Sequence, residues 1–333
     1  MVIVYFKMSG IGYSSITHMV QLAAELFEAE LLGFDSARRP QVLQKLEAFL
    51  PRRRGNETCL IVCPNPGELQ FLLQVEGWRR RFRRIVAWVI DAHMTEHIPW
   101  ISRLTRVFDQ IFVTREEDVP GWSRAAKAPI RWLPWGTDAF RLGSGAPNRV
   151  WDLIRVGRQP PEWEDDRSTE RACHPRGLSF HGRPEAAADD IENTRHVMRV
   201  LGQCKFTLAF SNTVDSSWYT HATRPYITGR WVDAIASGVV VAGIVPKMTA
   251  ADRLLWPGAT LDLGSIRRDE GLAVIESAVR EWRSEIPAEQ RRLALERLDW
   301  RWRFLTIADD LGESPKALHE EIGLLRQMAS HHE

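Results

Sequence analysis

The stretch TRPYITGRWVDAIASGVVVAG, residues 223–243, predicts a loop, a short helix and a buried strand in close succession. Thr228 and Gly229 end the loop, residues 231–237 have a helical pattern, and Gly238 terminates that helix. The apolar run 239–242 is typical of a strand that is buried on both faces. This order suits a parallel sheet, in which ligands lie at the carboxyl ends of strands and at the N-termini of the helices that follow.

The same alternation of strands and helices continues on both sides of this stretch. Before it, short apolar runs alternate with helical patterns; the runs are 2–8, 60–64, 85–90 and 110–114, and the helical patterns are 15–30, 40–50, 66–80 and 95–107. One more strand and a turn follow at 130–138, and the Gly- and Pro-rich stretch 141–149 reads as a linker. A second series of strands has runs at 152–158, 178–182 and 205–212. From about residue 266 only helical patterns remain, the clearest at 295–312.

These patterns predict an α/β protein with two Rossmann-like, doubly wound domains that face one another across a cleft. A chain of 333 residues is also too long for most single cores. We expect an N-terminal domain over residues 1–140 and a second domain over residues 150–300. The helices of residues 301–333 are expected to pack back across the junction.

Composition excludes several classes of protein. Lys and Arg number 44 against 43 Asp and Glu, so no net charge draws the chain to nucleic acid. No window resembles a membrane span, and the first residues lack the order of a signal peptide. The four cysteines, Cys59, Cys63, Cys173 and Cys204, have no metal-ligand spacing with His, which indicates reduced thiols in a cytoplasmic protein.

Candidate residues in the first half gather where its strands end. Gly10 and Gly12 precede the first long helix and allow a tight turn beside its N-terminus. A third glycine at the dinucleotide spacing is missing, which disfavours a nicotinamide cofactor. His18 in the first helix, with Asp91 and His93 after the strand 85–90, are candidate catalytic residues, because a carboxylate can orient an imidazole that removes a hydroxyl proton. The open alternative is structural: Asp91 caps a helix and each His is hydrogen-bonded in the core.

In the second half, Gly157 and Arg158 end one strand, and Ser211 and Asn212 end another. Lys205 precedes that second strand, and Arg230 begins the helix after Gly229. We interpret Arg158, Lys205 and Arg230 as cations for a phosphate-bearing ligand. Solvated surface charges are the alternative for each of them.

Two Arg-rich runs, 51–56 and 77–84, precede predicted strands. A solvated polar face is the simpler interpretation of both. Peripheral contact with anionic lipid is the alternative, because clustered Arg beside Trp78 and Phe82 would suit a headgroup layer.

The stretch 223–243, together with WLPWGTD at 132–138 and VGR at 156–158, resembles glycosyltransferases of the GT-B fold. The resemblance is closest to the spore-maturation-protein-like branch of the group 1 enzymes, and covers most of residues 130–312. It implies that the second domain holds the nucleotide of an activated sugar and that Asp233 stands where such enzymes carry a Glu that binds the ribose. A second acid expected about eight positions earlier is replaced by Pro225. The contact that this missing acid would make with the donor sugar would then come from Tyr226, Thr228 or backbone amides near Gly229.

The resemblance implies a hexosyltransferase that moves a sugar from a nucleoside-diphosphate sugar to an acceptor hydroxyl, with no cofactor. The acceptor is of unknown identity, whether a glycan, a lipid-linked molecule, a small molecule or a protein, and is expected on the side of Gly10 and Gly12. Because the sequence contains no Asp-x-Asp motif, we expect no obligatory metal. Two alternatives stay open. A sugar-nucleotide epimerase of the same fold would need no acceptor, and a non-catalytic binding or scaffold protein would fit the missing acid.

Overall fold

The computed structural model describes residues 1–7, 10–34, 40–51, 55–214 and 221–330. These form two compact units. The first comprises Met1–Pro134 and Arg301–Gly323, and the second comprises Trp135–Trp300 together with the chain from Leu324 onward. The division falls within α15 (Lys316–Ser330).

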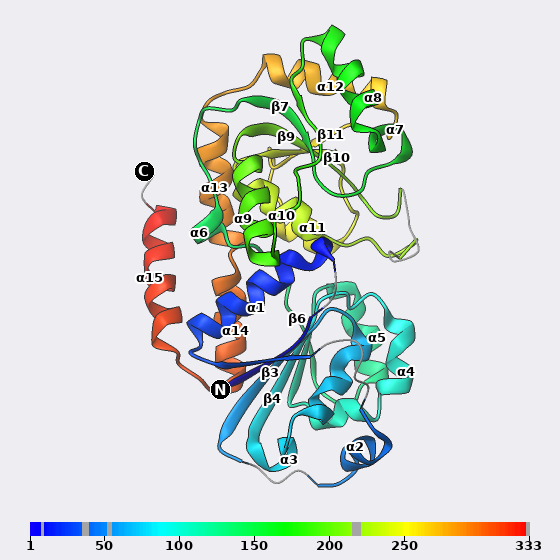
Figure 1. The fold of residues 1–333 in the computed structure, drawn as a ribbon, viewed down its shortest axis with the longest axis vertical. Helices are drawn as coiled ribbons and strands as arrows, with labels where there is room; N and C mark the ends of the chain where they lie inside the picture. Colours follow the sequence, from blue (N-terminus) through cyan, green and yellow to red (C-terminus); the bar gives the residue numbers. More distant parts are fainter. Residues whose placement is uncertain (8–9, 35–39, 52–54, 215–220, 331–333) are drawn as a thin grey trace. The chain divides into compact units, whose positions relative to one another are not determined.

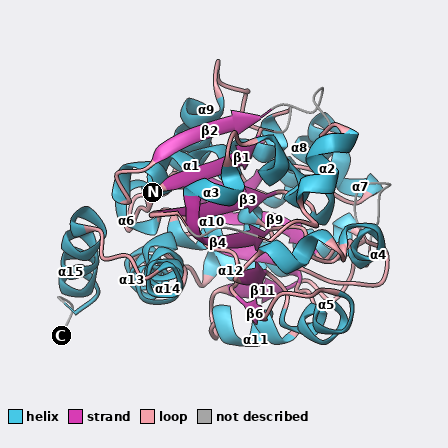
Figure 2. Ribbon diagram, turned by 90° about the horizontal axis from the view of Figure 1, so that it is seen from below, coloured by secondary structure: helices cyan, strands magenta, loops and turns pink. Residues whose placement is uncertain are grey.

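The first unit is built on a six-stranded parallel sheet with the order β2-β1-β3-β4-β5-β6. Its strands are β1 (Val2–Phe6), β2 (Glu30–Phe34), β3 (Glu57–Cys63), β4 (Phe82–Val89), β5 (Gln110–Val113) and β6 (Ile130–Trp132). Figure 2 shows β2, β1, β3 and β4 in this order. Every residue of β1 is buried, because helices cover both faces of the central strands.

Helices lie on both faces of this sheet. They are α1 (Ser14–Leu26), α2 (Val42–Glu47), α3 (Trp78–Arg81), α4 (Ile98–Ile101), α5 (Val119–Ala125) and α14 (Trp300–Leu311), with a 3-10 helix η2 (Pro66–Gln74). In Figure 1, α1 and α14 lie on one side of the sheet and α4 and α5 on the other. Short 3-10 turns over Thr95–His97 and Leu104–Val107 flank α4, so the helix expected over 95–107 is broken into pieces.

The second unit contains a five-stranded parallel sheet with the order β11-β10-β9-β7-β8. Its strands are β7 (Trp151–Arg155), β8 (Phe180–His181), β9 (Cys204–Phe210), β10 (Val240–Ile244) and β11 (Thr260–Asp262). The helices are α6 (Ala139–Leu142), α7 (Pro161–Glu164), α8 (Asp166–Cys173), α9 (Asp190–Leu201), α10 (Gly229–Ala236), α11 (Thr249–Leu254), α12 (Arg268–Arg280) and α13 (Ile286–Arg297). Figure 1 shows α8 and α12 on one side of the sheet and α9 and α10 on the other.

The two parallel, helix-covered sheets confirm the predicted α/β class with two Rossmann-like domains. Two edge strands were not predicted, however. β2 is exposed or half-buried and has only the short apolar run of residues 31–34, and β11 has only three residues, so neither stands out as a central strand does. From α12 to the end of the described chain the structure is helical, as expected.

The stretch 141–149 is not a linker, because the chain passes between the units at Pro134 and Trp135. Residues of this stretch are held within the second unit. Ser144 N donates to Ala236 O at 3.0 Å, and Arg149 Nη1 donates to Ser237 O at 2.9 Å. The glycines and proline therefore shape a fixed loop rather than a connection between domains.

Gly238 ends α10 in the left-handed region, with φ of +78°. A β-carbon at this position would lie 2.5 Å from Ser144 O and 2.3 Å from Arg149 Nη2. Both the backbone conformation and the close approach of the 141–149 loop therefore require glycine here. This agrees with the predicted helix end.

Candidate functional site

The carboxyl edge of the five-stranded sheet brings three predicted segments together. β7 is followed by Gly157 and Arg158, β9 by Ser211 and Asn212, and α10 begins at Gly229. Because β7 and β9 pair in parallel, both of their carboxyl ends lie at this edge. Concave edges of this kind are where open α/β sheets bind ligands.

Arg230 connects two of these segments. Its Nη1 atom donates a hydrogen bond to Arg158 O. A β-carbon on Gly157, which has φ of +69°, would lie 3.6 Å from the Arg230 Nε atom. The guanidinium of the first turn of α10 therefore packs on the loop after β7, and the arginines of the two segments are neighbours.

Asn212 holds the loop that leads to α10. Its side-chain amide donates to His221 O at 2.6 Å and to Arg224 O at 3.0 Å, and its Oδ1 atom accepts from Tyr226 N at 3.2 Å. This buried amide thus fixes the backbone on which Tyr226 and Thr228 stand. Ser211 makes a local contact, with Oγ 2.9 Å from Thr213 Oγ1.

Thr228 occupies the N-cap position of α10 with an extended backbone. Its buried hydroxyl makes no hydrogen bond to any residue that the structure describes. A buried hydroxyl at the start of a helix, beside Gly229 and Arg230, is placed to bind an anionic or hydroxyl-rich ligand.

The grouping of Lys205 with Arg158 and Arg230 was wrong. Lys205 is the second residue of β9, so it lies at the amino end of the sheet. Its Nζ atom forms an ion pair with Asp152 Oδ1 at 2.7 Å. The sequence could have excluded this grouping, because a residue at the start of a strand in a parallel sheet lies at the edge opposite to the residues that follow a strand.

Asp233 lies in the second turn of α10 with 9% of its surface exposed, so it is not a residue of an exposed helix face. Its Oδ1 atom accepts a hydrogen bond of 2.6 Å from Thr137 Oγ1. Burial raises the pKa of Asp233 to about 7; the Thr137 bond opposes this rise and the neighbouring Asp138 adds to it. The ribose-binding assignment stays a prediction, for a carboxyl group that already accepts one bond from its own chain.

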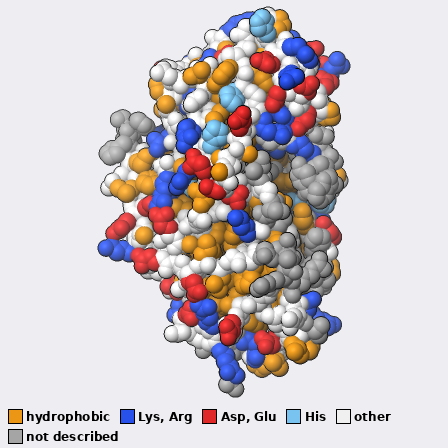
Figure 3. All heavy atoms as spheres, viewed as in Figure 1, with side chains coloured by type: hydrophobic (Ala, Val, Ile, Leu, Met, Phe, Trp, Pro, Cys, Tyr) orange, Lys and Arg blue, Asp and Glu red, His pale blue; other side chains and the backbone are white. Residues whose placement is uncertain are grey.

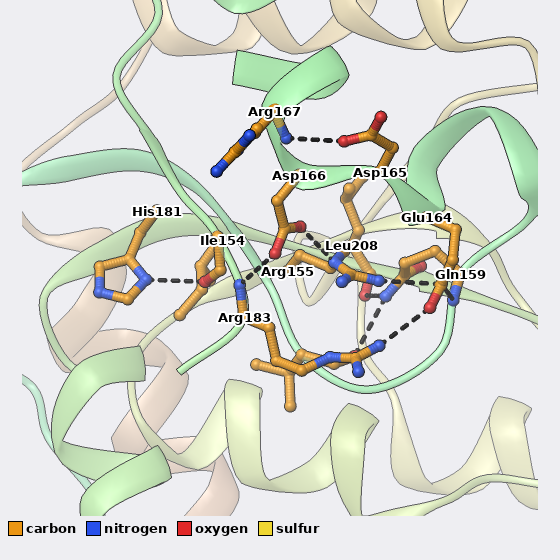
Figure 4. Close-up of polar contacts among 12 residues, drawn as sticks. Ile154, Arg155, Gln159, Glu164, Asp165, Asp166, Arg167, His181, Arg183 and Leu208 are labelled. Atoms are coloured by element: carbon orange, nitrogen blue, oxygen red, sulfur yellow. Dashed lines mark hydrogen bonds and ion pairs between the residues drawn. The ribbon is translucent and has the colours of Figure 1, made fainter. Parts of the chain in front are cut away.

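A network of ion pairs beneath the loop after β7 was not predicted (Figure 4). Buried Arg155 at the end of β7 pairs with Glu164 at 2.9 Å and with Asp166 at 2.5 Å. Arg183, which follows β8, pairs with Glu164 at 3.0 Å and donates to Gly157 O at 3.2 Å. The sequence signal that was overlooked is the acidic run Glu162–Asp166 so soon after a strand that ends in Arg.

Gln159 completes this network. It is 3% exposed, and its Nε2 atom donates to Val156 O at 3.1 Å and to Leu208 O at 3.0 Å. Its backbone N–H donates to Glu164 Oε2 at 2.8 Å. The loop that carries Gly157 and Arg158 is therefore tied to both β7 and β9.

In the first unit, Asp91 lies at the carboxyl edge, where its N–H donates to Pro64 O at 2.7 Å. Burial raises the pKa of Asp91 to about 7. Glu68, which was not predicted as a site residue, stands close to it. Burial raises the pKa of Glu68 to about 8, the Asn65 bonds oppose the rise, and the Asp91 charge adds to it.

The two histidines of the candidate catalytic group are both buried. His18 lies in the second turn of α1, and His93 follows Asp91 in the loop after β4. The described residues show no hydrogen bond or ion pair between His18 and Asp91, so their pairing stays a prediction. Gly10, with φ of +108°, accepts from Tyr13 N at 3.1 Å and forms the turn that leads into α1 beside Gly12.

The alternative that the 77–84 run contacts lipid finds no support in its side chains. Trp78 and Phe82 are 1% and 0% exposed, and Arg81 pairs with Glu57 and Glu30, so the 77–84 run presents no apolar surface. Arg52–Arg54 of the other run lie outside the described residues. Instead, α2 and the turn after it expose an apolar stripe, formed by Leu43, Leu46, Phe49 and Leu50 at 74%, 56%, 49% and 53%.

Charges of both signs are interspersed over the face of the molecule in Figure 3. Among the described residues, no group of three His, Cys, Asp or Glu side chains is arranged to hold a metal ion. All four cysteines are buried and free. No helix in the described ranges has the length and apolar character needed to cross a bilayer.

No protein-family model matches the chain, and no curated protein matches it. Among solved structures, it is similar to a Glycosylation Associate Protein complex from Streptococcus agalactiae, with 12% identity and a TM-score of 0.43 over 84% of this chain and 57% of that chain. It is also similar to S. aureus TarM in complex with fondaparinux, alpha-GlcNAc-glycerol and UDP, with 12% identity and a TM-score of 0.44 over 80% and 55%. The chain thus spans little more than half the length of these two proteins. A 5-methylthioribose transporter solute binding protein from Thermotoga lettingae gives 11% identity and a TM-score of 0.19 over 98% of both chains.

Proposed function

We propose that the protein is a glycosyltransferase that moves a sugar from a nucleoside-diphosphate sugar to an acceptor hydroxyl. The observation that carries the proposal is the meeting of Gly157, Arg158, Thr228 and Arg230 at the carboxyl edge of the second sheet. A glycine with positive φ, two arginines and a helix N-terminus are the groups that bind a diphosphate.

The leaving diphosphate gains negative charge as the bond from the anomeric carbon to its oxygen breaks. Arg158, Arg230 and the N-terminal amides of α10 stabilise that charge without a metal ion. Arg suits this task because its planar fork can bind two phosphate oxygens at once.

The acceptor hydroxyl, which forms the new bond to the anomeric carbon, must lose a proton. We assign this step to the first unit, where His18, Asp91 and His93 are the candidates. A carboxyl group with a pKa of about 7, such as Asp91, is suited to exchange a proton near neutral pH. The cause of this raised pKa is the burial of the Asp91 carboxyl group.

The acceptor identity is open, and the apolar stripe of α2 bears on it. Its four exposed apolar side chains lie in α2 and the turn after it, Lys45 stands in the same helix, and Arg106 packs over the Phe49 ring. We propose that this stripe rests on an anionic membrane, because apolar side chains flanked by cations bind such surfaces. A lipid-linked acceptor would then be presented near the first unit.

Transfer assays with radiolabelled nucleotide sugars and a panel of acceptors test the function. We expect acceptor-dependent release of nucleoside diphosphate that survives EDTA. Turnover of the nucleotide sugar to an isomer without an acceptor would instead establish the epimerase. Binding of no nucleoside diphosphate would favour the scaffold. The four free thiols support a cytoplasmic location, which fractionation of the native cells would test.

A further inference from the structure

We propose that Arg183 is a third arginine that binds the diphosphate, in addition to Arg158 and Arg230. It takes the role that had been expected of Lys205. The inference rests on the proposed function and adds a residue to the same site. Arg183 follows β8, which pairs in parallel with β7 through Leu153↔Phe180 and Ile154↔His181. Its backbone therefore reaches the carboxyl edge beside the loop of Gly157 and Arg158.

The guanidinium of Arg183 has donors that its own chain does not use. Its Nη2 atom makes both side-chain contacts, with Glu164 Oε1 at 3.0 Å and Gly157 O at 3.2 Å (Figure 4). Nε and Nη1 bond to none of the residues that the structure describes, and the side chain is 45% exposed. Arg carries five N–H donors in a planar fork, so the edge formed by Nε and Nη1 can bind two oxygens of a phosphate.

The backbone of Arg183 is held independently of its side chain. Its N–H donates to Asp166 Oδ2 at 3.0 Å, and Asp166 is in turn fixed by Arg155. A β-carbon on the preceding Gly182 would lie 2.9 Å from Asp166 Oδ2, so the glycine lets this carboxylate approach the chain. The guanidinium can consequently change partner while the main chain stays in place.

Glu164 has partners other than Arg183. It also accepts from buried Arg155 at 2.9 Å and from the backbone N–H of Gln159 at 2.8 Å. If Arg183 turned toward a phosphate, Glu164 would remain paired with Arg155. A diphosphate can then replace Glu164 as the partner of Arg183, because a half-exposed ion pair contributes little to stability by itself.

Arg176 provides a matched control in the same unit. It pairs with Glu276 at 3.1 Å and donates to Asp269 O at 3.4 Å, so it has the same two kinds of contact as Arg183. It lies in the turn before β8, at the amino side of that strand. A variant at this position loses comparable contacts away from the carboxyl edge.

The test is calorimetric titration of the full chain with inorganic pyrophosphate and with UDP, GDP and ADP, in metal-free buffer. We expect Arg183→Gln to weaken binding of pyrophosphate by about tenfold to a hundredfold. Arg176→Gln should bind like the wild type. Glu164→Gln should bind pyrophosphate more tightly, because the Arg183 charge is no longer neutralised. Thermal melting confirms that each variant is folded, and Arg183→Lys keeps the charge while removing the fork.

The outcomes separate the possible explanations. Wild-type affinity in Arg183→Gln, or no pyrophosphate binding by the wild type, overturns the role of Arg183. Equal weakening by Arg183→Gln and Glu164→Gln also overturns it, since both would then act only by holding the loop. If pyrophosphate binds through Arg183 but no nucleoside diphosphate binds more tightly, the Arg183 site stands and the glycosyltransferase proposal fails.

Discussion

Thr137 Oγ1 lies 2.6 Å from Asp233 Oδ1, so a hydroxyl just after the start of the second unit anchors a buried carboxyl group of α10. The bond accounts for one carboxyl oxygen of the residue predicted to bind the ribose. It also makes the assignment testable, because the internal partner and the carboxyl group can be removed separately.

We expect Asp233→Ala to weaken nucleoside diphosphate binding by roughly 30- to 1000-fold, as loss of charge-assisted bonds to the ribose would. Thr137→Val removes only the internal bond, so it should lower the free energy of unfolding by about 1 kcal/mol and leave affinity nearly unchanged. Calorimetric titration and urea unfolding measure the two quantities. An Asp233→Ala protein with wild-type affinity would remove Asp233 from the ribose site.

Substitutions at Arg230 and Lys205 should distinguish an effect on nucleoside diphosphate binding from an effect on stability. Arg230→Gln loses a cation at the carboxyl edge, and we expect it to weaken nucleoside diphosphate binding by about tenfold or more. Lys205→Met breaks the ion pair with Asp152 at the amino end, so it should affect only the unfolding midpoint. A larger loss of affinity in Lys205→Met than in Arg230→Gln would contradict the location of the site.

His18→Ala should lower turnover by roughly a hundredfold while donor affinity changes little, because a general base acts on the acceptor. Gln21→Ala, on an exposed position of the same helix, is the control. Steady-state kinetics with a fixed donor give both quantities. Unchanged turnover would exclude His18 from the mechanism and would also fit a retaining reaction that needs no such base.

Asp91 should make stability depend on pH. Its pKa rises from 3.8 to about 7 on folding, so the folded protein holds a proton that the unfolded chain releases. The associated stability is complete below a pH of about 4 and is lost as the pH rises through about 7. We expect the free energy of unfolding of Asp91→Asn to fall less steeply than that of the wild type between about pH 4 and pH 7.

The exposed Glu96→Gln serves as the control for this titration, since it lies in the same loop. Glu68 remains in both variants and should leave a residual slope that extends to about pH 8. Identical slopes for Asp91→Asn and the wild type in urea unfolding would show that Asp91 titrates normally.

The apolar stripe should carry membrane binding. We expect the double variant Leu46→Ser with Leu50→Ser to reduce partitioning onto phosphatidylglycerol vesicles by about tenfold or more, because two exposed leucines lose their burial in the headgroup layer. Leu324→Ser, which changes a leucine that is 50% exposed in α15, should bind like the wild type. Equal binding to neutral and anionic vesicles would contradict the role of the flanking cations, and dimerisation lost in the double variant would identify a second copy as the occupant.

The fold was predictable where burial leaves a continuous apolar run. β10 reads as Val-Val-Ala-Gly-Ile, and its position after a helix and a glycine was enough to indicate a parallel sheet. β2 was missed because its apolar run, residues 31–34, is short and follows directly on the helical pattern of residues 15–30. Sequence patterns thus identified the central strands better than the edges.

The candidate site was predictable only for residues next to a recognisable strand end. Arg158 follows such an end, Arg230 stands at a predicted helix start, and the structure places the two segments together. Arg183 and Glu164 could not be predicted, because their contact depends on the position of β8 beside β7. Lys205, by contrast, stands at the start of its strand, so its location at the amino edge of a parallel sheet could have been predicted from the sequence.

The position of Arg230 at the start of α10 depends on Gly238, which lies at the opposite end of this helix. A side chain at position 238 would collide with Ser144 and Arg149, so it would displace α10 from its position in the second unit. α10 has only eight residues, so a displacement of its C-terminal end would also move Arg230 at its N-terminal end away from Arg158. A substitution two turns away from Arg230 is therefore expected to disturb the proposed diphosphate site without changing any of the residues assigned to it.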